Sequence, residues 1–183
     1  MRTVTNFVIT LAAVTLFAAC GNTQKPMEAD PHAGHNHAPG VPVEKAVAGV
    51  SLKDDKLNAV YQHYIHLTTA LVNGDIAEVK VAANAIELGS RELSNGSTLT
   101  ALAAKIGVAK DIDAQRIVFS DLSKDFIARV KVSGLNSGEL YVEYCPMALN
   151  DKGASWLSNQ KDIKNPYFGE SMLNCGEVKE TIK

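Results

Sequence analysis

Four stretches between residue 51 and about residue 134 carry apolar residues at steps of three and four. This spacing places the apolar side chains on one face of an α-helix, which needs a neighbour to cover it. Turn and cap signals separate the stretches, at residues 73–75 (Asn-Gly-Asp), residues 95–97 (Asn-Gly-Ser), Gly107 and Gly134. Because the connections are short, the sequence predicts a mostly α fold, built as a four-helix up-down bundle.

After the fourth helical stretch the pattern changes to the alternation of β-strands. Residues 140–144 (Leu-Tyr-Val-Glu-Tyr) and residues 177–182 (Glu-Val-Lys-Glu-Thr-Ile) show this alternation. If the two runs pair antiparallel as a short β-hairpin, Cys145 after the first lies near Cys175 before the second. The segment between them has few helix signals, and we expect an irregular C-terminal flap that packs on the bundle through its aromatic residues.

The amino-terminal residues indicate an export signal. Arg2 is followed by an apolar run from Phe7 to Ala19, which is too short to span a bilayer. Residues 16–20 (Leu-Phe-Ala-Ala-Cys) are similar to the lipobox of bacterial lipoproteins, in which the cysteine is lipidated and becomes the first mature residue. The sequence therefore predicts a signal peptide over residues 1–19, lipidation at Cys20 and a membrane partner reached through this lipid anchor. We expect the protein in the cell envelope, on the outer membrane and facing the periplasm.

Residues 20–50 are rich in proline and small residues and lack apolar periodicity, so we expect a disordered tether. The tether contains His32, His35 and His37, three of the five histidines in the chain. Imidazoles at this spacing on a flexible segment can gather around zinc, copper(II) or nickel, which predicts a secondary metal site. The alternative is a solvated linker without a metal. Residues 51–183 are expected to form the helical-bundle domain with its flap.

Charge and motif content exclude several classes of function. The net charge of the chain is −2, and the loss of Arg2 with the signal peptide takes away one positive charge and brings it to −3. Nucleic-acid binding requires clustered Lys and Arg, and the sequence has no such cluster, so nucleic acid is not an expected partner. The sequence has no nucleophile elbow, phosphate loop or paired carboxylate motif, so we do not expect an enzyme.

The two cysteines that remain after lipidation each have a methionine close by, in mirrored order. Cys145 is followed by Met147, and Met172 is followed by Cys175. Thiolate and thioether donors select polarisable ions such as Cu(I) and Ag(I). These four residues are therefore predicted to form a soft-metal site, with Cu(I) favoured. Zinc would require more Cys or His ligands.

His63 and His66 lie three residues apart in the first helical stretch and project to neighbouring positions on it. By helical angle His66 lies nearly opposite the apolar stripe, which is typical of a solvated histidine. If the flap packs on that outer face, His63 or His66 would complete the sulfur cluster. Both interpretations stay open from the sequence alone.

A disulfide between Cys145 and Cys175 is the competing interpretation. Exported proteins meet an oxidising compartment, where paired cysteines commonly form disulfides. Closing a loop of about thirty residues would stabilise the fold by roughly 3 to 4 kcal/mol in the chain-entropy estimate. A disulfide would not explain Met147 and Met172, although methionine also fills ordinary cores. The sequence leaves open whether the sulfurs bind a metal ion or each other.

Several local motifs link the fourth helical stretch to the C-terminal segment. Arg116 and Phe119 precede Tyr-Cys-Pro-Met-Ala at 144–148, Trp-Leu-Ser at 156–158, Asn-Pro-Tyr-Phe-Gly at 165–169 and Met-Leu-Asn-Cys-Gly at 172–176. With these motifs the chain, over roughly residues 55 to 180, resembles an uncharacterised domain-of-unknown-function family of bacterial lipoproteins. Related domains are joined to periplasmic adaptor subunits of heavy-metal efflux pumps. The resemblance therefore implies metal handling, efflux components as partners and a four-helix domain with a motif-rich tail, but no established reaction.

We therefore expect a cell-envelope lipoprotein that binds copper or another soft metal ion. Its role would be metal sequestration, chaperoning or an accessory function in efflux, with the tether histidines collecting ions for the sulfur site. The alternative is a non-metal protein-interaction module that a Cys145–Cys175 disulfide closes.

Overall fold

The computed structural model describes residues 49–183, which form helices and two small antiparallel sheets. The predicted signal peptide and the predicted sites at Cys20, His32, His35 and His37 lie outside the described residues. The mostly α class is confirmed. None of the helices in the described part of the chain is both long and apolar enough to cross a membrane. The long helices are α1 (Asp55–Asn73), α2 (Ile76–Ser90), α3 (Ser97–Val108) and α4 (Ile112–Ser133).

These helices begin and end where the sequence supplies caps. The carboxylates of Asp54, Asp75 and Asp111 accept hydrogen bonds from backbone N–H groups in the first turn of α1, α2 and α4. Gly74 ends α1 with a φ of 69°, a backbone conformation that glycine adopts without strain. The predicted cap signals at Gly74, Asp75 and Gly134 are therefore confirmed, whereas Gly107 lies inside α3 and does not end it. The short connections let consecutive helices pack side by side.

A three-stranded antiparallel sheet follows the helices, in the order β4-β3-β5. The central strand β3 (Leu140–Cys145) pairs with β5 (Glu177–Ile182), which confirms the predicted pairing of these two runs. The third strand, β4 (Ala154–Ser158), lies in the segment for which the sequence predicts an irregular flap, so that part of the prediction is wrong. Trp156 and Leu157 are adjacent apolar residues, which breaks the alternation of this run, and β3 supplies the hydrogen-bonding edge that stabilises the strand.

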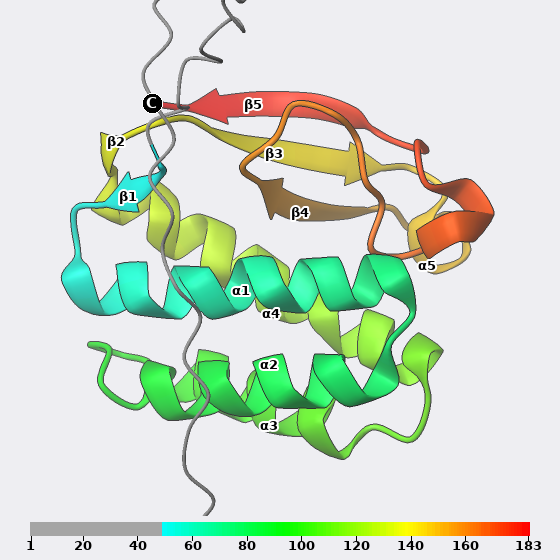
Figure 1. Ribbon diagram of the computed structural model, residues 1–183, viewed down its shortest axis with the longest axis horizontal. Coiled ribbons are helices and arrows are strands. Elements are labelled where there is room, and N and C mark those ends of the chain that lie inside the picture. Colours follow the sequence, from blue (N-terminus) through cyan, green and yellow to red (C-terminus); the bar gives the residue numbers. More distant parts are fainter. Residues whose placement is uncertain (1–48) are drawn as a thin grey trace, which may run out of the picture. The chain divides into compact units, whose positions relative to one another are not determined.

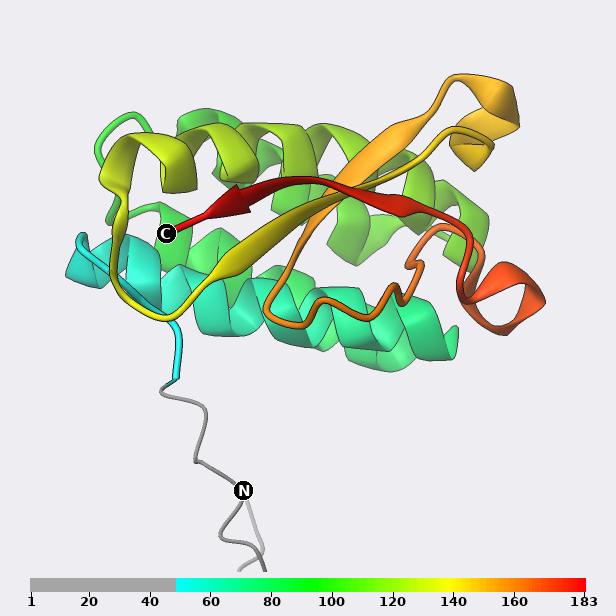
Figure 2. The same ribbon diagram turned by 90° about the horizontal axis from the view of Figure 1, so that it is seen from above.

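The sheet lies across the layer that α1 and α4 form, and α2 and α3 form a further layer on the side away from the sheet (Figures 1 and 2). β4 packs on α4 and also contacts α1. After the C-terminal end of α4, β2 (Leu135–Ser137) pairs antiparallel with β1 (Ser51–Leu52). Because the domain has a sheet layer in addition to its helices, a four-helix up-down bundle is not confirmed as its architecture.

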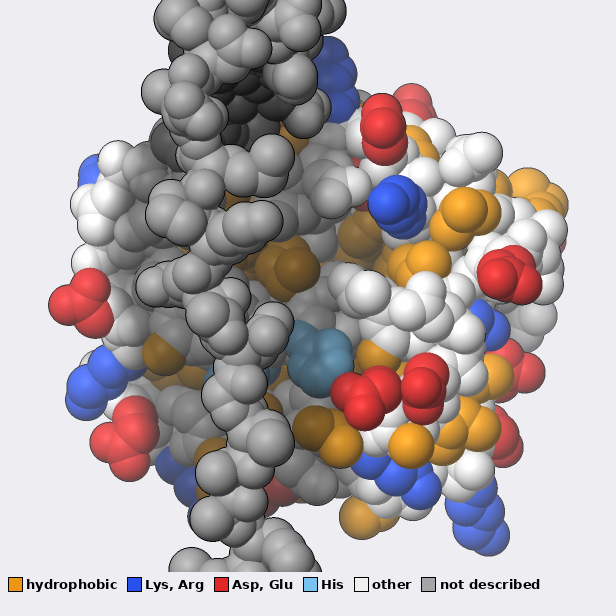
Figure 3. Space-filling view, in the orientation of Figure 1, with side chains coloured by type: hydrophobic (Ala, Val, Ile, Leu, Met, Phe, Trp, Pro, Cys, Tyr) orange, Lys and Arg blue, Asp and Glu red, His pale blue; other side chains and the backbone are white. Residues whose placement is uncertain are grey.

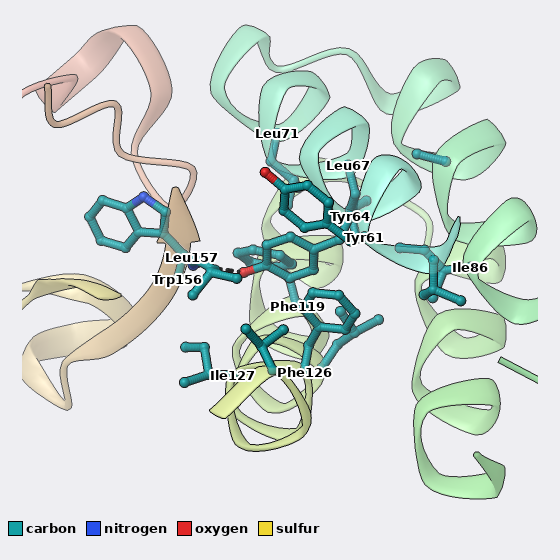
Figure 4. Close-up of a cluster of buried hydrophobic side chains, with 14 of the residues drawn as sticks. Tyr61, Tyr64, Leu67, Leu71, Ile86, Phe119, Phe126, Ile127, Trp156 and Leu157 are labelled. Atoms are coloured by element: carbon teal, nitrogen blue, oxygen red, sulfur yellow. Dashed lines mark hydrogen bonds between the residues drawn. The ribbon is translucent and has the colours of Figure 1, made fainter. Parts of the chain in front are cut away.

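The hydrophobic core lies between these layers, with aromatic residues from α1 and α4 at its centre (Figure 4). The rings of Tyr64 and Phe126 stack with centroids 4.5 Å apart. The Tyr64 hydroxyl accepts a hydrogen bond from the N–H of Leu157 (3.0 Å) and shares another with the Ser123 hydroxyl (2.7 Å). Leu157 points toward this cluster, whereas Trp156 lies on the other side of β4. One buried hydroxyl therefore links α1, α4 and β4.

The outer strand β5 carries a row of charged side chains at the edge of the sheet. Glu177, Lys179 and Glu180 are exposed. Lys179 forms an ion pair with Glu177 (2.6 Å), and Glu180 forms another with Lys131 of α4. The charged side chains at this edge of the sheet are therefore paired with each other along β5 and with a lysine of α4.

Candidate functional site

The two cysteines of the domain lie side by side, as predicted. Cys145 ends β3 and Cys175 comes two residues before β5, so the antiparallel pairing of these strands brings both to the same end of the sheet. Their Sγ atoms are 2.9 Å apart, and both residues are free thiols. Cys145 is buried and Cys175 is half-buried. Access to the sulfur pair is therefore from the side of Cys175.

The sulfur separation lies between the values that the two predicted chemistries require. A disulfide bond has a length of about 2.05 Å. Two thiolates that bind one tetrahedral metal ion at about 2.3 Å each are roughly 3.8 Å apart. From the observed 2.9 Å, either arrangement requires a change of about 0.9 Å in the Sγ–Sγ distance. The geometry therefore permits both a disulfide and a bound metal ion.

A buried asparagine fixes the backbone beside Cys175. The side-chain amide of Asn165 donates to the carbonyl of Cys175 (2.6 Å), and its side-chain oxygen accepts from the N–H of Tyr167 (2.8 Å). The backbone N–H of Asn165 also donates to the carbonyl of Leu173 (2.8 Å). These hydrogen bonds hold the chain before β5 in one conformation. Cys175 therefore loses little conformational entropy when both cysteines bind one ligand.

The only tryptophan of the chain lies against the same segment. Gly176 follows Cys175 with a φ of 146°, and a Cβ atom there would lie 3.0 Å from the indole ring of Trp156. A side chain at position 176 would therefore be strained by its backbone and would press on the indole. Trp156 is a single fluorescent probe close to the cysteine pair.

The pKa of the Cys175 thiol lies above its ordinary value. Its hydrogen bond with Cys145 raises the pKa of Cys175, and burial raises it further. Metal ions bind the thiolate, not the thiol. A metal ion that bound these two thiols would displace their protons, and its affinity would therefore increase with pH.

Met147 and Met172 line the same groove. Met147 precedes the short helical turn α5 (Ala148–Asp151), and Met172 ends the 3-10 helix η1 (Gly169–Met172). Both line a groove between α4, α5 and the segment before η1, and in the described part of the chain neither cysteine belongs to its lining. The two cysteines therefore contact each other, whereas the two methionines line a groove that neither cysteine lines in the described part of the chain.

Backbone strain marks the turn after Met147. Leu149, Asn150 and Asp151 have φ values of 56°, 57° and 61°. The left-handed conformation costs most non-glycine residues roughly 1 to 2 kcal/mol each, although Asn and Asp tolerate it better. Strain of this kind collects at functional sites. The adjacent Asn and Asp are the only signal for this turn in the sequence, and hydrophobic spacing does not predict it.

His63 and His66 are not brought to the sulfur pair. Both are exposed on α1, and histidine side chains show at the surface in Figure 3. The Nε2 atom of His66 lies 2.9 Å from Oε2 of Glu78 in α2. Within residues 49–183, no three His, Cys, Asp or Glu side chains are grouped to hold a metal ion. Within the described residues, neither histidine is therefore grouped with the two cysteines.

Glu143 is a further candidate residue, which the sequence patterns did not predict. It lies on β3 opposite Trp156 of β4 and two residues before Cys145, so the three side chains share one face of the sheet. The Glu143 side chain is fully buried. The side chains of Trp156 and Ser158 lie near its carboxylate and lower its pKa in part, but neither oxygen accepts a hydrogen bond of normal geometry within the described residues. Burial raises the pKa of Glu143 to about 8. The sequence signal for this residue is a single acidic side chain within residues 140–145, where the other residues are apolar or aromatic.

Comparison with known proteins identifies a relationship for the helical part of the domain. A family model described as a protein of unknown function (DUF3347) matches residues 60–138. The match begins in α1, includes α2, α3 and α4, and ends after β2. The predicted resemblance to a domain of unknown function is thereby confirmed for the helices, whereas the motifs with Cys145 and Cys175 lie beyond the match. No curated protein and no solved structure matches the chain.

Arg116 connects this matched region to the C-terminal motifs. Its guanidinium donates to the carbonyls of Pro166 (2.9 Å) and Leu71 (3.2 Å) and pairs with Asp113 (3.4 Å). The Arg116 side chain is only 13% exposed, so these bonds are largely shielded from water. The arginine of the fourth helix therefore positions the Asn-Pro-Tyr-Phe-Gly motif at residues 165–169.

Arg116→Met should lower the free energy of unfolding by about 2 to 4 kcal/mol, because two carbonyls in a shielded site lose a charged donor. Urea unfolding followed by circular dichroism measures this change. Arg91→Met is the matched control: Arg91 pairs with Glu87 one turn away on a more exposed surface and should contribute less than about 0.5 kcal/mol. Equal losses in the two variants would contradict the positioning role of Arg116.

Proposed function

We propose that the protein is a cell-envelope lipoprotein that binds Cu(I), or another soft metal ion, through the thiolates of Cys145 and Cys175. Its role is metal sequestration, chaperoning or an accessory function in efflux. The observation that carries this proposal is the 2.9 Å contact between two Sγ atoms from residues thirty positions apart.

Two converging sulfur donors suit Cu(I) better than harder ions. Soft thiolate ligands select Cu(I), whereas structural zinc sites use four ligands, of which two thiolates supply half. The sheet and Asn165 hold both cysteines in place, which reduces the ordering cost of binding. The partial exposure of Cys175 gives a metal carrier access to the pair.

The features predicted for the amino-terminal segment fit this function. Lipidation at Cys20 would hold the domain at the outer membrane on the periplasmic side. His32, His35 and His37 would collect metal ions at a secondary site. Heavy-metal efflux components are the partners that the sequence resemblance implies. The proposal includes no enzymatic reaction.

Replacing both cysteines tests the proposal. We expect the reduced, mature full-length protein in detergent to take Cu(I) from a chromogenic chelator under anaerobic conditions. The Cys145→Ser/Cys175→Ser variant should bind at least about 100-fold more weakly, because hydroxyl groups replace both soft donors. Quenching of Trp156 fluorescence gives an independent measure of binding beside the pair.

The triple variant His32→Ala/His35→Ala/His37→Ala is the matched control for this experiment. It removes the predicted tether site and should retain the tight Cu(I) site. The proposal is wrong if the double-serine variant competes with the chelator as well as the wild-type protein does.

The same sulfur contact favours a second candidate, a non-metal protein-interaction module closed by a Cys145–Cys175 disulfide. A disulfide would form readily in an oxidising compartment. Thiols counted in protein isolated from the envelope without reductant distinguish the candidates. The disulfide candidate predicts no reactive thiol at either position and no Cu(I) uptake after reduction, whereas the metal proposal predicts uptake by the reduced pair.

A further inference from the structure

Two thioethers share an open groove on the described part of the chain. The groove encloses about 660 Å³ between α4, the turn α5 and the segment that leads into η1. Met147 and Met172 line it together with Tyr167 and Phe168. Met147 is 48% exposed and Met172 is half-buried, so the groove is open to solvent. A soft ligand for a metal ion is therefore accessible outside the cysteine pair.

Both walls of the groove have a fixed conformation. On one side, the strained turn at residues 149–151 follows Met147 directly. On the other side, Gly169 packs so closely on the helices that a Cβ atom would lie 2.6 Å from the carbonyl oxygen of Val72 and 2.9 Å from Arg116. A preformed groove of this kind loses little conformational freedom when a ligand binds.

We infer that Met147 and Met172 form a separate acceptor site for a soft monovalent cation, Cu(I) or Ag(I), from which the ion passes to Cys145 and Cys175. The inference rests on the function proposed above for the cysteines. Thioethers bind such ions without losing a proton, so they accept and release them more readily than thiols do. The N–H of Cys175 donates to the carbonyl of Met172 (3.1 Å), so the two sites share a backbone turn.

Transfer between the sites is a ligand exchange without a change of oxidation state. Two metal–thioether bonds break and two metal–thiolate bonds form, while the two thiols release their protons to water and copper stays Cu(I). The negatively charged thiolates are the stronger donors, so the exchange runs toward the cysteines. The volume of the groove leaves room for a ligand of the delivering carrier beside the ion.

The rate of Cu(I) uptake tests the inference in a background with His32→Ala, His35→Ala and His37→Ala. Leucine replaces methionine with little change in volume. We expect Met147→Leu/Met172→Leu to retain the Cu(I) affinity of the cysteine site within about threefold. In stopped-flow mixing with a Cu(I)–chelator complex, the same variant should take up Cu(I) at least about tenfold more slowly than its parent.

Ag(I) titration gives a second measurement that does not depend on the cysteines. With Cys145→Ser and Cys175→Ser added to the same background, we expect one weakly bound Ag(I) per chain. This equivalent should disappear when Met147→Leu and Met172→Leu are added. Met27→Leu is the matched control because Met27 belongs to the predicted tether at residues 20–50. This variant should keep both the uptake rate and the Ag(I) equivalent.

The outcomes separate this inference from the proposed function. An unchanged uptake rate and an unchanged Ag(I) equivalent in the leucine variant would overturn the inference. Loss of the tight Cu(I) site in that variant would show one joint site and would also overturn it. Unchanged chelator competition in the double-serine variant would instead overturn the function of the cysteines. Urea unfolding of each variant establishes that it is folded.

Discussion

Raising the pH from about 5 to about 8 should destabilise the metal-free protein, and Glu143→Gln should remove most of this effect. The carboxyl group of Glu143 is buried without a hydrogen-bond partner in the described chain, and burial raises its pKa from 4.5 to about 8. In the unfolded chain the group ionises near its ordinary pKa, so between these two values the folded state binds more protons. The stabilising contribution is full below the unfolded pKa and is lost as the pH rises through the folded pKa.

Glutamine has nearly the shape of the neutral acid and does not ionise, so it isolates this titration. At pH 8.5 we expect Glu143→Gln to be more stable than the wild-type protein by several kcal/mol, on the order of 3. At pH 5 the two proteins should differ by less than about 1 kcal/mol. Urea unfolding at a series of pH values, with reductant and chelator present, measures both differences.

Glu139→Gln is the matched control for Glu143→Gln. Glu139 is exposed and accepts a hydrogen bond from Tyr141, and its ion pair with Lys183 contributes to lowering its pKa. Its replacement should leave the slope of stability between pH 5 and pH 8 unchanged. If Glu143→Gln shows the same slope as the wild-type protein, Glu143 does not titrate in this range.

Tyr64→Phe should destabilise the domain by about 2 to 5 kcal/mol, because it leaves two buried groups without their hydrogen-bond partner. These groups are the N–H of Leu157 in β4 and the hydroxyl of Ser123 in α4. The change removes only one oxygen atom, so the loss measures hydrogen bonding more than packing. Urea unfolding gives the magnitude, and Trp156 fluorescence reports whether β4 loosens before the helices unfold.

Tyr61→Phe is the comparison for Tyr64→Phe. Tyr61 is on the same helix and is also buried, but its hydroxyl has no hydrogen bond within residues 49–183, and burial alone raises its pKa to about 12. Its loss should change the free energy of unfolding by less than about 1 kcal/mol. Similar losses for Tyr61→Phe and Tyr64→Phe would show that the Tyr64 hydroxyl does not connect the layers.

The helices were predictable because their signals are local. Apolar spacing selects one face, and the carboxylates at Asp54, Asp75 and Asp111 bond to backbone groups within three residues. The sheet depends on partners far away in the chain. The β3–β5 pairing was accessible because both runs alternate, whereas β4 is a strand only because β3 lies beside it.

The candidate site was predictable to the same extent. The adjacency of Cys145 and Cys175 follows from the pairing of β3 with β5, and this pairing is predictable from the alternation of the two runs. The groove that Met147 and Met172 line includes the left-handed turn at residues 149–151, which hydrophobic spacing does not encode. Glu143 escaped detection because burial on both sides of a strand is a property of the assembled layers.

The charged edge formed by β5 has a consequence for crowding. An open strand edge can template the pairing of a second chain. On β5, a second copy would have to bring its own Glu177, Lys179 and Glu180 against those of the first and strip water from them. Strand-by-strand aggregation at this edge is therefore unfavourable, even at high protein concentration.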